Sequence, residues 1–261
     1  MGRTIFTFTL LLFLTSCSFG EKVADKYNQP VNRKPYGKSM KGKRILLYGD
    51  SISSGYYPWY RSALLSLSQA AEVYPAGFSG YTTALLAQDA QLQRIYDYNP
   101  DIIICLVGGN DTGEENSVGT FGVTNEPKVE ETDLEEDYNR GYFIQSVSHI
   151  MRKLESHYSM SESKPFIVFC TPLPQKRSNR FNIFSQPENW LRKRDAVVEA
   201  CNKYDIKCID FYNLCDWDFT KEPYFTMPPD LVNNRGIFTM DGLHPNQRGY
   251  EDMARIICEE M

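Results

Sequence analysis

The hydrophobic pattern of this chain alternates between short apolar runs and longer stretches in which apolar residues recur at helical spacing. The clearest run, Ile102–Val107, is apolar at every position, as expected of a parallel strand that is buried on both faces. Runs of this kind predict strands at Ile45–Tyr48, Glu72–Tyr74, Ile102–Val107, Phe166–Cys170 and Lys207–Asp210.

Between the predicted strands lie stretches with amphipathic helical spacing. They predict helices at Tyr57–Ser68, Thr82–Tyr98, Leu134–Tyr158 and Glu188–Tyr204, and a last helix that begins at Gln247. An alternation of strand and helix is typical of a three-layer α/β/α sandwich with a parallel sheet. Ligands of such sheets bind beyond the carboxyl ends of the strands, so residues that directly follow a strand are the first candidates for function.

The N-terminal segment has the features of an export signal. Arg3 precedes the apolar-rich stretch Thr4–Ser16, which is too short to be a convincing membrane span. The stretch ends in Leu14-Thr15-Ser16-Cys17, which resembles the lipobox of bacterial lipoproteins, in which the cysteine carries the lipid. We therefore expect a signal peptide over residues 1–16, lipidation of Cys17, a flexible polar tether over residues 17–43 and one large domain over residues 44–261. An ordinary signal peptide with an incidental Cys17 is the alternative.

Charge and cysteine usage narrow the classes of function. The formal net charge of −5 argues against nucleic acid as the main partner. No pair among the seven cysteines has the Cys-x-x-Cys spacing of a metal site. Cys105 and Cys170 lie inside apolar runs, where a free cysteine acts as a small hydrophobic residue. We expect mostly free thiols, with a bridge among Cys201, Cys208 and Cys215 as the exception to consider.

Two polar motifs supply the groups of a serine nucleophile system. Gly49-Asp50-Ser51 follows the first predicted strand, and Asp241-Gly242-Leu243-His244 lies near the C-terminus. A serine hydroxyl is a weak nucleophile at neutral pH and needs a neighbouring base. That base needs a carboxylate, which orients the ring and stabilises the imidazolium. Because Asp241 and His244 are close in the chain, one loop can carry both to Ser51. The motifs predict a serine hydrolase.

Two further segments offer donors for the oxyanion formed during acyl transfer. Asn110 lies in Gly108-Gly109-Asn110-Asp111, directly after a predicted strand. A side-chain amide in this role contributes roughly 3 kcal/mol or more in known enzymes. Gly80 follows the predicted strand Glu72–Tyr74, and its backbone N–H, like that of Ser51, is a second candidate donor. Ser51, Gly80 and Asn110 therefore all belong at the carboxyl edge of the predicted sheet.

These segments, in this order, resemble the SGNH (GDSL-type) hydrolase superfamily over roughly residues 43 to 260. The resemblance matches Ser51 to the nucleophile and Asp241 and His244 to the other catalytic residues. It matches the N–H of Ser51, Gly80 and the Asn110 amide to the oxyanion hole. It also implies five parallel strands in a flavodoxin-like order, and ester hydrolysis that needs no cofactor and no metal.

Each motif also fits an ordinary turn when it is taken alone. Ser51 could cap a helix, and glycine, asparagine and aspartate favour turns for their own reasons. Asn246 is expected to cap the last helix, while Asp50 and Asp111 are expected to accept backbone hydrogen bonds that shape their turns. The joint occurrence of all the motifs at strand ends favours the catalytic interpretation.

The expected function is that of an exported, membrane-anchored esterase, periplasmic or at the cell surface, which removes acetyl groups from carbohydrate. Aromatic residues close to the motifs could stack on sugar rings or hold an acyl chain: Tyr56, Tyr57, Trp59 and Tyr81. A lysophospholipase or thioesterase would use the same machinery, and a sugar-binding lipoprotein without catalysis would share the aromatics and the tether. A metal-dependent hydrolase would instead bring together Asp50, Asp111, Asp241 and His244.

Overall fold

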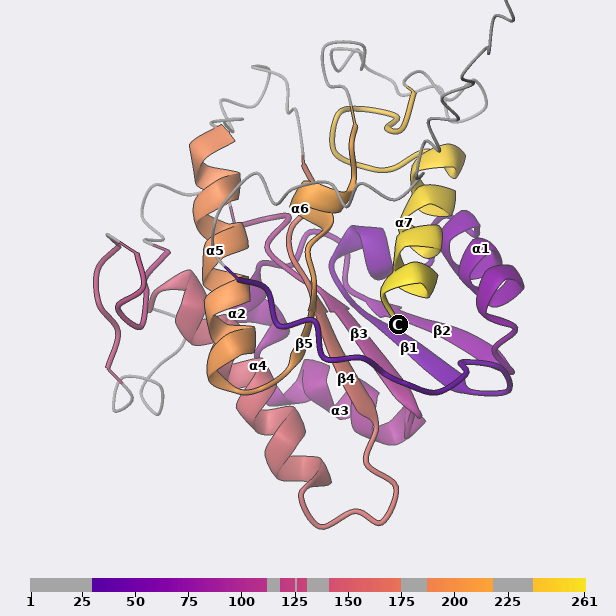
Figure 1. The fold of residues 1–261 in the computed structure, drawn as a ribbon, viewed down its shortest axis with the longest axis horizontal. Helices are drawn as coiled ribbons and strands as arrows, with labels where there is room; N and C mark the ends of the chain where they lie inside the picture. Colours follow the sequence, from indigo (N-terminus) through magenta and orange to yellow (C-terminus); the bar gives the residue numbers. More distant parts are fainter. Residues whose placement is uncertain (1–29, 112–117, 125, 131–140, 175–186, 218–236) are drawn as a thin grey trace, which may run out of the picture.

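A five-stranded parallel sheet with helices on both faces forms the centre of the molecule (Figure 1). The computed structural model describes residues 30–111, 118–124, 126–130, 141–174, 187–217 and 237–261. The strand order β2-β1-β3-β4-β5 confirms the predicted three-layer fold and is the flavodoxin-like order. The strands are β1 Arg44–Gly49, β2 Glu72–Gly77, β3 Ile102–Leu106, β4 Phe166–Cys170 and β5 Lys207–Ile209.

Alternating side chains of the strands divide the hydrophobic core between the two faces of the sheet. Leu46 and Tyr48 of β1 point into one core, which is completed by α2 to α5. Ile45 and Leu47 point into the other core, against α1, α6 and α7. Burial on both faces explains why the strands are apolar at nearly every position.

The helices lie close to the predicted ranges at most positions. They are α1 Trp59–Ser68, α2 Thr83–Leu86, α3 Asp89–Tyr98, α4 Phe143–Tyr158, α5 Pro187–Lys203, α6 Phe211–Leu214 and α7 Gln247–Glu260, with a short 3-10 helix, η1, at Ser51–Ser53. The expected cap of the last helix is confirmed, because the Asn246 side chain accepts from Gly249 N at 3.0 Å. None of the helices among the described residues is long and apolar enough to cross a membrane.

Two predicted helices need correction. The stretch Thr82–Tyr98 is two helices, because Gln88 takes an extended conformation (φ −69°, ψ 144°) and begins α3 as its N-cap. The helix predicted over Leu134–Tyr158 is not continuous, because Tyr142 is extended and begins α4 at Phe143 in a capping box with Gln145; residues 131–140 lie outside the described residues. Periodicity shows no break at Gln88 or Tyr142, whereas local capping begins a new helix at each of them. Helix α6 was not predicted.

The segment before β1 also differs from the expectation. A flexible tether was predicted through residue 43, but the described residues 30–43 lie against the domain. Cys208 N donates to Asn32 O at 2.8 Å, and Tyr36 N donates to Met261 O at 3.2 Å. Lys34 pairs with Asp205 at 2.7 Å. These contacts hold the segment to β5 and to the end of α7. Residues 17–29 and the expected lipidation site Cys17 lie outside the described residues.

The described part of the chain holds six cysteines, all of them free thiols. They include Cys201, Cys208 and Cys215, among which a bridge was considered. Burial raises the pKa of the Cys201 thiol well above its usual value, and a hydrogen bond with Cys208 raises it further. The Cys201 thiol therefore acts as a protonated, buried packing group.

Candidate active site

The candidate nucleophile lies in a tight turn at the carboxyl end of β1. Gly49 has φ +152°, and a Cβ there would lie 2.1 Å from the carbonyl oxygen of Leu106, so only glycine fits beside β3. Asp50 Oδ1 accepts from Ile52 N at 3.0 Å, as expected of a residue that shapes its own turn. This turn begins η1 with Ser51 and leaves Ser51 partly exposed at the edge of the sheet.

Asp241 and His244 lie together in the loop that leads into α7. Asp241 Oδ1 accepts from the backbone N–H of Leu243 at 3.0 Å and of His244 at 2.7 Å. Gly242, with φ +81°, makes the turn between them possible. The loop is closed by Met240 N, which donates to the His244 carbonyl at 2.9 Å. The aspartate thus organises the loop and the imidazole together.

A continuous chain of hydrogen bonds joins the three side chains. Ser51 Oγ lies 3.0 Å from His244 Nε2, and His244 Nδ1 lies 2.7 Å from Asp241 Oδ2. The carboxylate contact assigns the proton to Nδ1, which leaves Nε2 as an acceptor for the serine hydroxyl. The imidazole is 27% exposed and the aspartate 12%, so the ring is more open to solvent than the carboxylate that it bonds.

The charge of Asp241 is stabilised by the groups around it. Burial by itself would raise the pKa of this carboxyl. The hydrogen bond and charge of the His244 ring, and the backbone N–H groups of His244 and Leu243, outweigh burial, so the pKa of Asp241 lies below its usual value. The carboxylate is therefore ionised at neutral pH, next to the ring that it orients.

Asn110 lies at the carboxyl end of the neighbouring strand, β3. Its Nδ2 donates to the carbonyl oxygen of Tyr81 at 3.1 Å, and Tyr81 directly follows Gly80. The structure therefore joins the two segments that were expected to supply oxyanion donors. An amide nitrogen carries two N–H bonds, and the bond to Tyr81 holds the group in one orientation.

Gly77 and Gly80, in the segment at the end of β2, have different surroundings. A Cβ on Gly77, the last residue of β2, would lie 2.3 Å from the Asp50 carbonyl and 2.5 Å from the Ser53 carbonyl carbon. Gly77 therefore lets β2 pack against the nucleophile turn. Gly80 has φ +81° with open space beside it, and it lies in an exposed turn in which Tyr81 N donates to Phe78 O. Gly80 is thus the glycine with room for a ligand.

A buried hydrogen-bond network supports the Asn110 turn, and sequence reasoning missed most of its members. Asp111 accepts from Thr83 N and from Thr83 Oγ1 at distances of 2.9 to 3.1 Å, so it links the turn to α2 as well as shaping the turn itself. Burial raises the pKa of Asp111, and Lys193 and Thr83 oppose that rise. Lys193, buried on α5, donates to the backbone carbonyl of Asp111. No motif distinguishes Thr83 or Lys193 from other helix residues.

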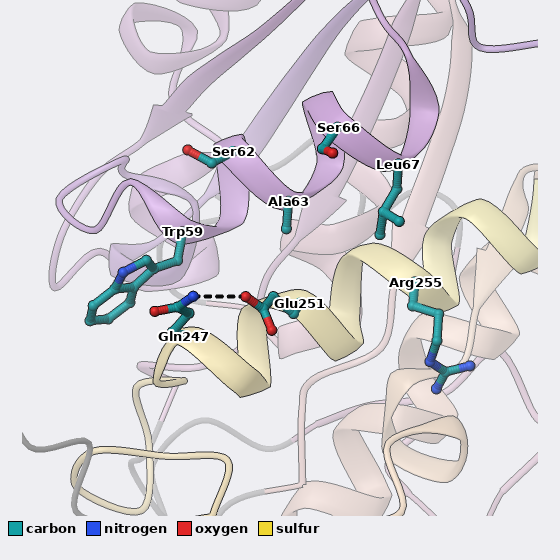
Figure 2. A pocket seen from close by; sticks show the side chains of 8 residues that line it. All are labelled: Trp59, Ser62, Ala63, Ser66, Leu67, Gln247, Glu251 and Arg255. Carbon is teal, nitrogen blue, oxygen red and sulfur yellow. Dashed lines mark hydrogen bonds between the residues drawn. The ribbon is translucent and has the colours of Figure 1, made fainter.

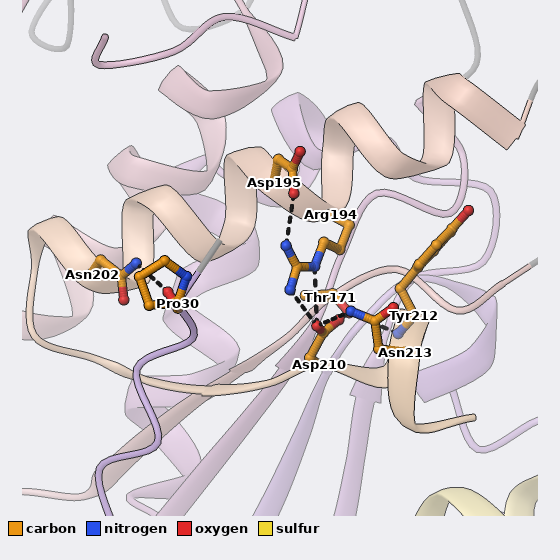
Figure 3. A network of polar contacts seen from close by, with 8 residues as sticks. All are labelled: Pro30, Thr171, Arg194, Asp195, Asn202, Asp210, Tyr212 and Asn213. Atoms are coloured by element: carbon orange, nitrogen blue, oxygen red, sulfur yellow. Dashed lines mark hydrogen bonds and ion pairs between the residues drawn. The ribbon is translucent and has the colours of Figure 1, made fainter. Parts of the chain in front are cut away.

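A second buried network lies beyond the ends of β4 and β5 (Figure 3). The guanidinium of Arg194, on α5, is fully buried and donates twice to Asp210 Oδ2, at 3.0 and 2.6 Å. Asp210 also accepts from Thr171 at 3.0 Å and from Asn213 at 2.7 Å. The network joins α5, the exit of β4 and α6, so it holds the carboxyl edge of the sheet together.

The carboxylates of the metal-dependent alternative each have a different partner. Asp50 bonds its own turn, Asp111 bonds Thr83, and Asp241 bonds His244. Among the described residues, no group of three or more histidine, cysteine, aspartate or glutamate side chains is arranged to hold a metal ion.

Comparison with known proteins identifies the family. The chain matches the model of the GDSL-like Lipase/Acylhydrolase family over residues 47–251. No curated protein shows a significant match.

Several solved structures share the fold. A possible lipase from Chitinophaga pinensis is 17% identical, with a TM-score of 0.56, and the alignment covers 83% of this chain and 96% of that one. A lipase/acylhydrolase from Enterococcus faecalis is 19% identical, with a TM-score of 0.52, and the alignment covers 84% and 94%. An acetyl xylan esterase is 20% identical, with a TM-score of 0.52, and the alignment covers 83% and 98%.

The family match spans most of the chain, and it includes both Ser51 and His244. The predicted relationship to the GDSL-type hydrolases is therefore confirmed. The chain belongs to the GDSL-like lipase/acylhydrolase family and is a hydrolase of ester bonds.

Proposed function

We propose that the chain hydrolyses carboxylic esters through a Ser51–His244–Asp241 triad. The observation that carries this proposal is the unbroken hydrogen-bond chain from Ser51 Oγ to His244 Nε2 (3.0 Å) and from His244 Nδ1 to Asp241 Oδ2 (2.7 Å). This order of groups provides a nucleophile, a base with the correct tautomer and an ionised group that stabilises the imidazolium.

In the proposed reaction, Ser51 Oγ attacks the ester carbonyl carbon and its proton moves to His244 Nε2. The oxyanion accepts hydrogen bonds from the N–H groups of Ser51 and Gly80 and from the Asn110 amide. His244 then protonates the alcohol as the ester C–O bond breaks, which leaves an acyl group on Ser51. A water molecule, deprotonated by His244, releases the acid and restores the serine.

For the substrate, we propose an O-acetylated carbohydrate. Aromatic rings lie beside the nucleophile turn, where Tyr57 and Trp59 stack with ring centroids 5.2 Å apart. The acetyl xylan esterase that shares the fold acts, by its name, on an acetylated polysaccharide, so acetylated xylan is a suitable first probe. Because a fold accommodates many substrates, this part of the proposal depends on the experiment below.

For location, we propose an exported lipoprotein anchored through Cys17. The support is the sequence Leu14-Thr15-Ser16-Cys17 after an apolar stretch. The first residues of the described chain, near Pro30, lie on the domain surface, where the Asn202 side chain donates to the Pro30 carbonyl at 2.8 Å.

The test compares the purified protein with Ser51→Ala on acetylated xylan, other acetylated saccharides, and p-nitrophenyl esters of rising acyl length. We expect release of acetate from a saccharide, a preference for short acyl groups, and loss of more than about 10³-fold of activity in Ser51→Ala. A Ser51→Ala variant with substantial activity would refute the triad. A preference for long acyl chains would favour a lysophospholipase or thioesterase, and Ser51-dependent activity on synthetic esters alone would refute only the carbohydrate assignment.

A further inference from the structure

An open groove runs between α1 and α7 on the outside of the molecule (Figure 2). Its volume is about 520 Å³, and exposed or partly exposed side chains of the two helices form its walls. The residues that matter for its chemistry are Trp59, Ser62, Ser66, Leu67, Gln247 and Glu251. None of them takes part in the proposed triad or oxyanion hole.

The groove begins next to the proposed catalytic residues. Trp59 is the first residue of α1, which follows the turn of Ser51, and Gln247 is the first residue of α7, which follows the loop of His244. Figure 2 shows these two side chains together at one end of the groove, and Leu67 toward the other. At 1.5 Å of rise per residue, the α1 wall from Trp59 to Leu67 is about 12 Å long. The groove thus leads away from the catalytic edge along the surface.

An aromatic pair connects the groove to the catalytic residues. The rings of Tyr57 and Trp59 are nearly parallel, with an angle of 2° between their planes. Burial raises the pKa of Tyr57, with smaller contributions from Tyr56 and from the charge of Asp241, so the phenol lies within electrostatic reach of the catalytic carboxylate. Tyr57 therefore lies beside Trp59 at the N-terminal end of α1, on the side of the chain that leads back to the turn of Ser51.

The walls combine apolar surface with polar groups, a combination that suits a sugar chain. Trp59, Ala63 and Leu67 offer apolar surface, against which the C–H faces of sugar rings can pack. The hydroxyls of Ser62 and Ser66 and the amide of Gln247 can donate and accept hydrogen bonds. Polar groups along an apolar surface fix the orientation of a polar ligand.

One polar pair in the groove is already arranged before any ligand binds. Gln247 Nε2 donates to Glu251 Oε1 at 2.9 Å, and the dashed line in Figure 2 marks this bond. The bond holds the amide oxygen of Gln247 and the second oxygen of Glu251 along one wall as acceptors for hydroxyl groups. An arranged pair loses less side-chain entropy when a ligand binds.

On the basis of the proposed carbohydrate esterase function, we propose that the groove between α1 and α7 is a subsite that binds the sugar chain of the acetylated substrate, with Trp59 as its main contact. The ester then lies at Ser51, and the rest of the chain extends along the two helices. Because these contacts are distant from the reacting carbonyl, they bind substrate and transition state equally. They therefore lower KM and leave kcat unchanged.

The experiment measures kcat and KM on acetylated xylo-, manno- and chito-oligosaccharides of increasing length and on p-nitrophenyl acetate, for wild type, Trp59→Ala and Gln247→Ala. For the wild type, kcat/KM on the saccharides should rise with chain length. p-Nitrophenyl acetate has no sugar chain and is too small to reach the groove. Trp59→Ala should raise KM for the longer chains by about 5- to 10-fold and remove most of the length dependence. Gln247→Ala should have a smaller effect in the same direction.

Arg61→Ala is the matched control, because Arg61 is an exposed residue of α1 that does not line the groove. Circular dichroism and thermal unfolding report whether each variant is folded, and Gln247 is exposed, so its removal leaves the core intact.

The possible outcomes separate the two proposals. Activity on p-nitrophenyl acetate without activity on any saccharide refutes the carbohydrate assignment, and the subsite with it. Activity on saccharides that does not depend on length, or that is equal in Trp59→Ala and Arg61→Ala, overturns the subsite alone. A dimer in solution that Leu67→Arg converts to a monomer would show that a second copy of the chain occupies the groove, and would also overturn the subsite.

Discussion

At the scale of single residues, the site depends on few side chains with defined partners. Asp241 has two tasks, because one oxygen holds the backbone of the loop and the other holds the His244 ring. Asn110 is oriented by its bond to the Tyr81 carbonyl. In the proposed reaction Asp241 supports the base and Asn110 supports the oxyanion, so the two residues differ in the step that their loss should affect.

Replacement of Asn110 should affect catalysis more than substrate binding. We expect Asn110→Ala to lower kcat by about 10²-fold or more with little change in KM, because the amide matters most when the oxyanion forms. Asn110→Asp is the matched control, since it keeps the size of the side chain and removes the donor; it should be at least as impaired. Steady-state kinetics on p-nitrophenyl acetate would measure both. A change in KM alone would make Asn110 a substrate-binding residue.

The proposed roles of Asp241 and His244 predict how activity should depend on pH and how the variants at the two positions should differ. Histidine side chains in general titrate near pH ~6.5, whereas the pKa of Asp241 is lowered, so the carboxylate stays charged as pH falls through that range. Activity should therefore rise with pH in one step, as the imidazole loses its proton. Asp241→Asn should be severely impaired but retain more activity than His244→Ala, which has no base.

The measurement is a kcat/KM profile from about pH 5 to 8. A rate that stays constant over this range would contradict a histidine base and would reopen the metal-dependent alternative. Loss of activity in a chelator, restored by a divalent cation, would then support that alternative.

At the scale of elements, the carboxyl edge of the sheet is held by buried polar networks. Asp111, Thr83 and Lys193 fasten the Asn110 turn to α2 and α5. Arg194 and Asp210 fasten α5 to the end of β5 (Figure 3). Because the edge is made of loops, these bonds limit the conformations that the catalytic segments can adopt.

Loss of Arg194 should therefore destabilise the fold strongly. We expect Arg194→Ala to lower the free energy of unfolding by about 3–5 kcal/mol, because it leaves the buried Asp210 carboxylate without its cation. Urea denaturation followed by circular dichroism would measure the change. Arg61→Ala, at an exposed position on α1, should change stability by less than about 0.5 kcal/mol. Equal midpoints for the two variants would show that the buried pair does not stabilise the fold.

At the scale of the whole molecule, the carboxyl edge of the sheet carries the proposed active site, and the N-terminal residues 30–43 lie on the other side of the domain. The proposed triad, the oxyanion donors and one end of the α1/α7 groove lie at the carboxyl edge, as ligand sites of such sheets do. Residues 30–43 cross the other side of the domain and contact β5 and the C-terminus. A tether on this side would leave the proposed active site unobstructed.

The anchoring proposal has a direct test in the producing cell. Cys17→Ser should move the protein from the membrane fraction to the soluble fraction, because a serine cannot carry the lipid through a thioether. Fractionation followed by immunoblotting measures this, and Cys258→Ser, at a half-buried position, is the control that should leave the distribution unchanged. If the wild-type protein were wholly soluble, an ordinary signal peptide would be the better explanation.

The amino-acid sequence by itself determined the class of fold and the chemical groups of the site. Continuous apolar runs indicated buried parallel strands, and the motifs around Ser51, Asn110 and His244 followed strands or preceded the last helix. Such local patterns can be read without coordinates because the period of a strand or helix is a property of neighbouring residues. Helix boundaries were less predictable, since the N-caps Gln88 and Tyr142 begin helices at positions where the apolar spacing shows no break.

Only the tertiary structure decided which distant groups meet. Nothing local marks Lys193 or Arg194 among the polar residues of α5, yet both are buried and hold the carboxyl edge. The groove between α1 and α7 exists because the two helices pack on the same face of the sheet. Residues 30–43 look like a tether by composition, and contacts with β5 and α7 hold them in place. Such contacts depend on chain segments far apart in sequence, so no local pattern contains them.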